Sequence, residues 1–409
     1  MAPQQLRNRL LDPRTYVLPY VLLWLGVGLL PFQPTDLDVF FWPSAAVAVH
    51  GHPLLVYSAG GHALYPNANG PVSLLPLSIV AWLLNAAGQL DATVLRRGAA
   101  MAVFSLLVIL MAREAVAAVE RLRGAPLTGG PRLLAYLVLS LNTLAWQSVA
   151  GYGHIEQPIE IWLLLVAARL LNERKSLGAG VAFGLSIMAR SPAVLMTIPL
   201  GLAAWQRGFR QAATFAATAV VSALAVLTPF LLADPTDVIH SLFTYRGSLK
   251  VGAGSIWSLA RGGPLENVAQ HYDIALIVVV VVATNLWMAR RGGLTEDRLF
   301  AAMTVTAGAF AMLAKTVWPY YMFEVFMFGT VWAAGTWRPA MGVIRLVLLP
   351  LAVSIFALIA EIGSEQGLPL VLVRTEGPAM FVMLGLTLAW TIWFATREPA
   401  GRRVEAAWT

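Results

Sequence analysis

The chain contains no cysteine, and only 12% of its 409 residues are charged. Without cysteine there is no disulfide framework, no thiolate nucleophile and no thiolate metal site. A soluble domain of this length carries about twice that charged fraction, whereas 58% of the residues here are hydrophobic and the mean hydropathy is +0.70. The composition therefore argues against a soluble fold and predicts an all-α protein embedded in a membrane.

Apolar runs recur along the whole chain. A helix needs about 20 mostly apolar residues to cross the hydrocarbon core, and we expect about twelve such helices in one membrane domain over residues 1–409. The first run, 16–30, follows a basic segment without a small-residue cleavage site, so we expect it to remain as an anchor. The expected spans are 15–33, 99–118, 133–150, 158–171, 178–190, 192–205, 212–232, 272–289, 299–314, 319–336, 341–361 and 378–395.

Basic residues predict the orientation. Cytoplasmic loops of membrane proteins are enriched in Lys and Arg. We attribute the net charge of +7 to such loops, and we therefore expect no nucleic-acid partner. The loops 119–132 and 172–177 are basic, and they face the cytoplasm only if the apolar stretch 72–89 does not cross completely. We therefore expect a multi-pass protein of the plasma (inner) membrane with both termini cytoplasmic. The extracytoplasmic loops are then 34–98, with interfacial or re-entrant helices, and the long loop 233–271.

In this topology the polar chemistry is one-sided. All six histidines and many of the acids fall at the outer face, whereas the cytoplasmic loops carry mostly Arg. A secondary transporter or lipid-carrier flippase, the main alternative, is expected to place ionisable groups near the midplane of repeated halves, and no clear repeat is present. A non-catalytic scaffold has nothing specific for or against it. The one-sided distribution favours an enzyme with an extracytoplasmic active site.

Two carboxylates, Asp36 and Asp38, directly follow the first span. In an extended segment their side chains face the same side, and in a helix they diverge. A carboxylate at the membrane edge can serve as a general base towards a sugar hydroxyl, and two of them can hold a divalent cation against a phosphate. The alternative is an ordinary solvated acid, because Thr35-Asp36 is a good helix N-cap. A zinc site is disfavoured, since His50-Gly51-His52 lacks the spacing of a helical ligand pair.

Two further sets of polar residues lie at the expected outer face. The short turn 151–158 holds His154, Glu156 and Gln157, although a polar turn capped by glycine and proline is the alternative explanation. The second set is cationic, on the side where positive charge is disfavoured. Such residues can bind a phosphate, because Arg forms bidentate hydrogen bonds with phosphate oxygens and Lys supplies a point charge. The alternative is that these long side chains only extend to the lipid headgroups. These cations are Arg190, Arg246, Lys250 and Lys315.

The first outer loop resembles that of a known family. Its features are Thr35-Asp36-Leu37-Asp38, the Ala45-Ala46 pair, Gly51, and Tyr65-Pro66 ahead of an apolar helix. They are similar to membrane glycosyltransferases of the GT-C class, above all the polyprenol-phosphate-dependent mannosyltransferases and the glycosylphosphatidylinositol mannosyltransferases. The likeness covers about residues 15–200. Family members often have two prolines near this point, where this chain has Pro66-Asn67.

The resemblance implies a GT-C-like fold and an inverting transfer of a sugar, with mannose the first choice. The donor is then a polyprenyl-phosphate sugar, and the acceptor is a lipid-linked glycan or a glycolipid in the same membrane. The implied base is Asp36, or Asp38. No cofactor is implied with certainty, and a divalent cation stays open. The implied substrate-binding residues are Tyr65, His154, Glu156, Gln157 and Arg190. The position of Arg246, Lys250 and Lys315 at the expected outer face, and not the resemblance, adds these three cations as candidate ligands of the donor phosphate.

Overall fold

The computed structural model describes residues 12–30, 36–58, 67–252, 254–336 and 370–397. These residues form helices and no strand, which confirms the all-α prediction. The helices of eight or more residues are α2 (Val17–Leu29), α3 (Trp42–Val49), α4 (Pro71–Ala86), α5 (Thr93–Arg123), α6 (Gly129–Ser140), α8 (Glu156–Asn172), α9 (Ser176–Ile187), α10 (Thr197–Gln206), α11 (Phe209–Ala233), α14 (Pro264–Arg290), α15 (Glu296–Leu313), α16 (Met322–Thr336) and α18 (Leu370–Arg397).

Shorter helical segments connect the long helices. They lie mainly where the chain turns, and several of them carry the polar residues discussed below. They are η1 (Pro13–Tyr16), η2 (Leu37–Phe41), α7 (Thr143–Trp146), η4 (Gln147–Tyr152), η5 (Ser191–Met196), α12 (Pro235–Ile239), η6 (His240–Thr244), α13 (Tyr245–Ser248), η7 (Ile256–Ala260) and η8 (Pro319–Tyr321).

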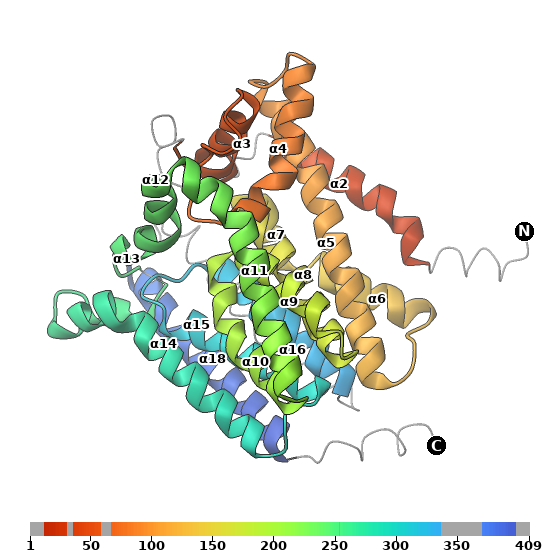
Figure 1. Ribbon diagram of the computed structural model, residues 1–409, viewed down its shortest axis with the longest axis vertical. Helices are drawn as coiled ribbons and strands as arrows, with labels where there is room; N and C mark the ends of the chain where they lie inside the picture. Colours follow the sequence, from red (N-terminus) through yellow and green to blue (C-terminus); the bar gives the residue numbers. More distant parts are fainter. Residues whose placement is uncertain (1–11, 31–35, 59–66, 253, 337–369, 398–409) are drawn as a thin grey trace, which may run out of the picture.

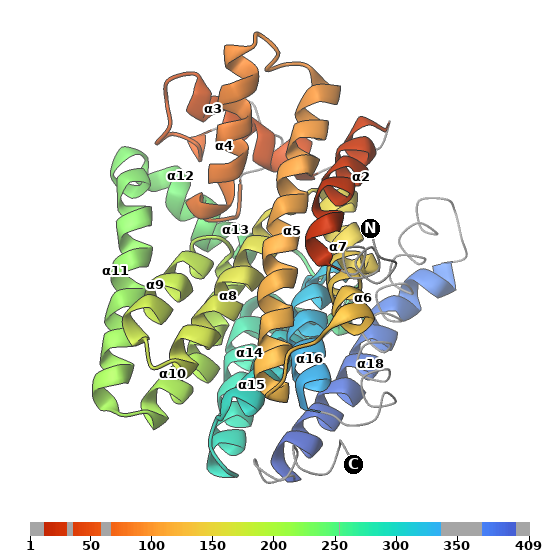
Figure 2. The same cartoon turned by 90° about the vertical axis from the view of Figure 1, so that its right-hand side faces the viewer.

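The long helices form a bundle whose upper end holds the irregular connections. Figures 1 and 2 show α5, α8, α9 and α11 side by side, with α3, α4 and α12 towards the upper end. Helices α8, α15 and α16 form the centre, and almost all residues of α16 are buried. By contrast, α11 and α14 are mostly exposed and present large apolar side chains such as Val221 and Val279. An apolar outer surface of this kind fits lipid surroundings.

The number of candidate membrane spans is smaller than expected. Among the described residues, three helices are long and apolar enough to cross a membrane, namely α5, α11 and α14, or four if the pair Gly129–Ser140 and Leu144–Tyr152, bent by 42°, counts as one span. These helices indicate a membrane protein, but the prediction of about twelve spans is wrong by this measure.

The short lengths of several apolar helices explain the difference. Helix α9 has 12 residues and α10 has 10, so at 1.5 Å per residue each is under about 20 Å long, against a hydrocarbon core of about 30 Å. Helix α4, with 16 residues, is also no candidate span. The expected span 341–361 lies outside the described residues.

Small residues allow α9 to pack closely on α11. A side-chain carbon added at Gly180 would lie 2.4 Å from the carbonyl oxygen of Phe215, and one at Gly184 would lie 2.3 Å from that of Ala219. Close approach through small residues is typical of helix pairs in membranes. This contact fixes the position of α9, whose end leads to Arg190.

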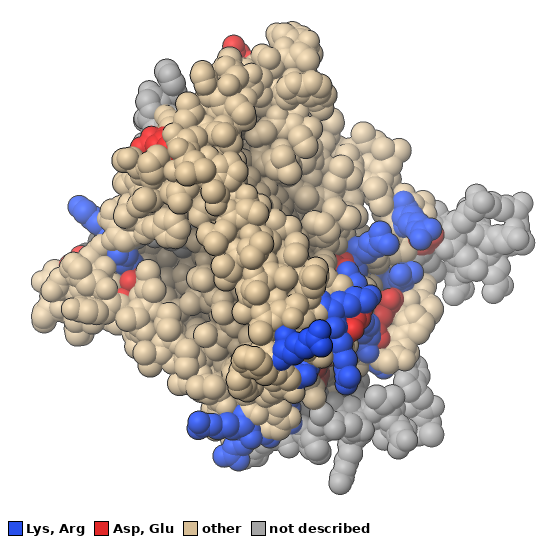
Figure 3. Space-filling view, in the orientation of Figure 1, with Lys and Arg blue, Asp and Glu red and all other residues tan. Residues whose placement is uncertain are grey.

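Basic side chains gather at one end of the molecule. Figure 3 shows Lys and Arg mainly in its lower half, to the right and below, with a smaller group on the left. This end holds the connection between α5 and α6, whereas the connection between α4 and α5 lies at the upper end (Figure 1). The asymmetry agrees in kind with the enrichment of cytoplasmic loops in positive charge.

Candidate functional site

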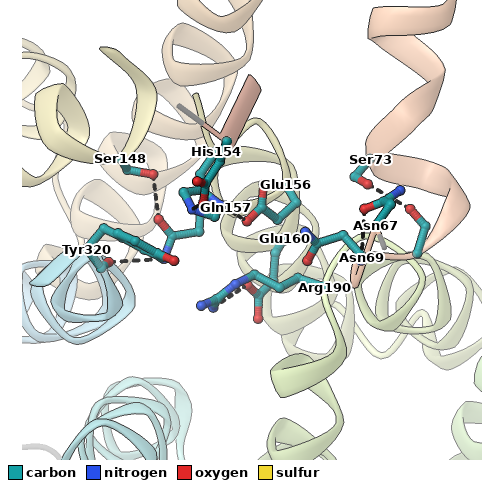
Figure 4. A network of polar contacts seen from close by, with 12 residues as sticks. Asn67, Asn69, Ser73, Ser148, His154, Glu156, Gln157, Glu160, Arg190 and Tyr320 are labelled. Atoms are coloured by element: carbon teal, nitrogen blue, oxygen red, sulfur yellow. Dashed lines mark hydrogen bonds and ion pairs between the residues drawn. The ribbon is translucent and has the colours of Figure 1, made fainter. Parts of the chain in front are cut away.

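Four chain segments bring a buried polar cluster together. Asp36 precedes η2, His154 lies in the turn between η4 and α8, Arg190 lies between α9 and η5, and Glu324 belongs to the first turn of α16. Figure 4 shows His154, Glu156, Glu160 and Arg190 close together in this cluster. The polar side chains therefore come from segments far apart in the sequence.

Gly153 makes the approach of two of these segments possible. Its φ of +80° is a left-handed conformation that glycine adopts without strain. A side-chain carbon at this position would lie 2.5 Å from Cβ of Leu37. Because glycine has no such atom, the turn before α8 packs directly against η2, and His154 comes to lie beside Asp36.

His154 lies between two carboxylates. Its Nδ1 contacts Oε1 of Glu156, and its Nε2 lies 2.9 Å from Oδ2 of Asp36, although this second contact lacks hydrogen-bond geometry. Burial alone would lower the pKa of the imidazole, but the charges of Glu156 and Asp36 outweigh it and raise the pKa of His154 to about 9. The ring is therefore protonated at neutral pH, and it cannot serve as a base there.

Asp36 and Asp38 do not converge. Asp38 accepts hydrogen bonds from Nε of Arg96 at 3.2 Å and from Nε of Arg97 at 2.9 Å, both at the start of α5. The segment 37–41 is helical, and two side chains two residues apart on a helix point in different directions. Asp38 thus joins η2 to α5, while Asp36 faces His154. The two acids do not form a shared cation site.

Arg190 is buried between two glutamates. Its Nη1 donates to Oε2 of Glu160 at 3.2 Å and also to Oε1 of Glu324, and its Cζ lies 4.9 Å from the ring centre of Tyr321. These carboxylates raise the pKa of the guanidinium despite burial, which acts to lower it. Nη2 has no hydrogen-bond partner among the described residues. The charge of Arg190 is therefore largely balanced within the protein.

Gln157 links the turn to α16. Its Oε1 accepts from Oγ of Ser148, and its Nε2 donates to the carbonyl oxygen of Tyr320 at 3.0 Å and to Oε1 of Glu324 at 3.4 Å. The side chain is fully buried and its amide is used within the protein (Figure 4). Gln157 therefore positions the cluster, and it does not face the cavity described next.

A cavity of about 160 Å³ adjoins the cluster. Glu156, which lines this cavity, carries a buried Oε2 without a hydrogen-bond partner among the described residues, so one carboxylate oxygen beside the cavity is unsatisfied by the protein. The volume is below the range of about 300–1,000 Å³ for pockets that enclose drug-sized ligands, so it suits one sugar-sized unit. The lining includes Asp36, His154, Glu156 and Arg190, together with Asn69, Tyr245, Trp318, Tyr320 and Tyr321.

The remaining predicted cations lie in different surroundings. Lys315 is buried, and its Nζ donates to the carbonyl oxygens of Gly247 and Gln270, each at 2.9 Å. It thereby holds the segment 233–271 against the end of α15, which is a structural use of its charge. Lys250 is exposed. Arg246 lies in α13, between cavity residues Tyr245 and Leu249, and Tyr65 lies outside the described residues.

Residues that sequence reasoning did not assign to the site complete it. Glu160 and Glu324 balance Arg190, and Tyr320 stacks near His154 with ring centres 4.1 Å apart. Glu160 follows Glu156 by one helical turn, in an otherwise apolar run, and an acid on an apolar helix is a usable signal. Among the described residues, no group of three or more His, Asp or Glu side chains has a metal-binding arrangement.

Comparison with known proteins does not assign the chain to a family. No protein-family description and no curated protein sequence matches it.

Proposed function

We propose that this chain is a membrane glycosyltransferase that moves a sugar, with mannose the first choice, from a polyprenyl-phosphate donor to a lipid-linked or glycolipid acceptor. The observation that carries the proposal is the placement of Asp36, His154 and Glu156 together on the wall of one small, aromatic-lined cavity. The GT-C-like fold and the extracytoplasmic position of the cavity belong to the same proposal.

The charge of the cluster suits a reaction with a positive transition state. Four carboxylates, Asp36, Glu156, Glu160 and Glu324, lie around two cations, His154 and Arg190. Burial, and then the neighbouring Glu324, raise the pKa of Glu160 well above its usual range. Even with Glu160 neutral, three carboxylates outnumber the two cations, and the cluster is negative. Glycosyl transfer passes through an oxocarbenium-like state, and fixed negative charge in a water-poor site stabilises positive charge that develops there.

Asp36 is the candidate base. Its side chain is 23% exposed, whereas that of Glu156 is 1% exposed, and His154 is already protonated. Asp36 would take the proton of the acceptor hydroxyl while that oxygen attacks the anomeric carbon. The bond from this carbon to the phosphate oxygen then breaks, and the prenyl phosphate leaves with the electron pair. Attack from the face opposite the leaving group inverts the anomeric centre.

The donor phosphate belongs at the mouth of the cavity. The negative charge of the cluster repels an anion, and the charge of Arg190 is balanced by two glutamates. Arg246 directly follows cavity residue Tyr245, and Lys250 directly follows cavity residue Leu249, so they are the cations that we assign to the phosphate. Trp318, 42% exposed at the cavity, offers an apolar face to the sugar or the prenyl chain.

The test is direct transfer. The purified full-length chain is incubated with polyprenyl-phosphate sugars and lipid acceptors, and product formation is compared between the unchanged protein and Asp36→Asn. Transfer that is lost in Asp36→Asn supports the proposal. Absence of transfer from every donor in a broad panel by a folded protein, or equal transfer by both proteins, contradicts it.

One observation favours a second candidate, a proton-coupled transporter or lipid-carrier flippase. The sequence alone indicated few ionisable groups inside the helices, but Glu160, Arg190 and Glu324 form a buried charged group, and buried ionisable groups between membrane helices often carry protons. Proteoliposomes with an imposed pH gradient test this candidate. Proton movement that depends on Glu160 and on a transported substrate favours the transporter over the transferase.

A further inference from the structure

A second cavity, of about 720 Å³, lies between η1, α2, α5 and α6, away from the candidate site. Figure 1 shows α2, α5 and α6 grouped on the right of the molecule. Arg97, which binds Asp38, and Arg113, which lines this cavity, both belong to α5 and are about 24 Å apart along its axis at 1.5 Å per residue. The cavity therefore faces a different level of the bundle.

Three arginines reach this cavity from three segments: Arg14 from η1, Arg113 from α5 and Arg132 from α6. Two carboxylates lie nearby. Asp12 accepts from the backbone N–H of Arg14 at 3.0 Å, and Oε1 of Glu120 lies 3.3 Å from Nε of Arg132. No carboxylate of the described residues forms an ion pair with the guanidinium of Arg14 or Arg113. The cavity is therefore positive, with guanidinium groups available to an anion.

The start of α6 adds further donors. Thr128 and Gly129 line the cavity, and α6 begins at Gly129 with no side-chain cap on its first turn. The first N–H groups of a helix have no partner within the helix, and together with the helix dipole they favour an anion. Uncapped amides and three arginines thus meet at one cavity, which is a donor set suited to phosphate oxygens.

The rest of the wall is apolar. Val17, Ile109, Leu110, Leu133 and Leu137 line it, and the neighbouring surface of α2 exposes Leu18 and Leu22. A free phosphate ion makes no favourable contact with these apolar side chains, whereas an acyl chain packs against them.

We propose that this cavity binds an anionic phospholipid of the surrounding membrane. Arg14, Arg113, Arg132 and the first amides of α6 hold its phosphate, and its acyl chains lie along α2 and the apolar wall. The site does not depend on the proposed glycosyl transfer. It anchors α2 and α6 to α5, since the lipid touches all three helices.

The experiment uses the delipidated full-length chain in detergent. Binding of phosphatidylglycerol, phosphatidylcholine, a polyprenyl phosphate and inorganic phosphate is measured by native mass spectrometry and by the shift in Tm. We expect phosphatidylglycerol to bind most tightly. Loss of one charge-assisted hydrogen bond weakens binding about tenfold or more, which we expect for Arg14→Gln, Arg113→Gln and Arg132→Gln.

Arg290→Gln, an exposed change at the end of α14, is the matched control and should bind normally. Arg14→Gln keeps the test decisive if a change within α5 or α6 prevents folding, because it lies outside the long helices. Equal binding of phosphatidylcholine, tighter binding of the polyprenyl phosphate, inorganic phosphate binding as tightly as the lipid, or unchanged binding by the three variants would each overturn the proposal.

Discussion

Nε2 of His154 lies 2.9 Å from Oδ2 of Asp36, which joins the turn before α8 to the segment that opens η2. This contact places an acid and a protonated imidazole on the same cavity wall. It separates the roles of the two neighbouring aspartates, because Asp38 faces the arginines of α5 instead.

Asp36→Asn is predicted to lower turnover while the protein stays folded. Asparagine keeps the size of the side chain but cannot take a proton, and general-base catalysis contributes about 10²–10⁴-fold. Initial rates with a prenyl-phosphate sugar measure the effect, mainly in kcat. Asp91→Asn, at an exposed acid in the turn before α5, is the control with normal rates. Near-normal turnover in Asp36→Asn would remove this residue from the mechanism.

Asp38→Asn is predicted to act on stability and not on chemistry. The change leaves Arg96 and Arg97 without their carboxylate, and hydrogen bonds to charged groups contribute about 1.5–3 kcal/mol. We expect a lower Tm of the detergent-solubilised protein with turnover per folded molecule largely kept. Since Arg96 and Arg97 both share the interaction, Asp38→Asn should add little to the double change Arg96→Gln and Arg97→Gln. Lost turnover at an unchanged Tm would place Asp38 in the reaction.

Arg190→Gln is predicted to destabilise the fold strongly. It leaves Glu160 and Glu324 buried without a cation, and breaking a buried ion pair in this way costs about 3–5 kcal/mol. Thermal unfolding measures the loss, and adding Glu324→Gln should recover part of it by removing one uncompensated charge. Arg210→Gln, at an exposed site on α11, is the control. A stable Arg190→Gln protein with a raised KM for the donor would instead show that Arg190 binds the phosphate.

Stability is predicted to fall as pH rises from about 6.5 to about 9. The pKa of His154 is raised in the folded protein to about 9 from an ordinary value of 6.5, so its contribution is complete below pH 6.5 and is lost as the pH passes 9. The difference corresponds to roughly 3 kcal/mol. Tm measured across this range should decline less in His154→Gln. Equal slopes for both proteins would show that His154 does not titrate in this window.

Gly70→Ala is predicted to destabilise the segment that leads into α4. A side-chain carbon at Gly70 would lie 2.1 Å from the carbonyl oxygen of Met188, close to the Arg190 turn, and overpacking costs typically about 1–3 kcal/mol. Gly201→Ala is the matched control, because the added carbon meets nothing within 4 Å inside α10 and should stabilise by about 0.5–1 kcal/mol. Similar Tm values for both variants would contradict this packing.

The proposed orientation is tested by labelling, since the chain has no cysteine of its own. Gln89→Cys lies in the turn between α4 and α5, and Ala125→Cys lies at the opposite end of α5. An impermeant thiol reagent added outside intact cells should label position 89 and not position 125. The reverse pattern would place the cavity on the cytoplasmic side, where a lipid-linked donor offers no advantage over a nucleotide sugar.

The sequence by itself determined the properties that depend on composition and on near neighbours. Low charge and long apolar runs require helices, because buried backbone groups in a lipid environment are satisfied within a helix. The acids after the first span and the turn around His154 were recognisable for the same reason: polar residues stand out in apolar surroundings. The number of full spans was not recognisable from the sequence, because an apolar run does not show whether it breaks into short packed helices such as α9 and α10.

Only the tertiary structure decided which charges meet. Asp36 and Asp38 have the same chemistry and nearly the same position in the sequence, and the helical turn of η2 sends one to His154 and the other to Arg96 and Arg97. In the sequence, Arg190 and Lys315 both had the features of phosphate ligands. In the structure, glutamates of α8 and α16 balance the charge of Arg190, and backbone carbonyl oxygens accept hydrogen bonds from Lys315. Such pairings join segments far apart in the chain. They depend on how helices pack, which no local pattern of residues records.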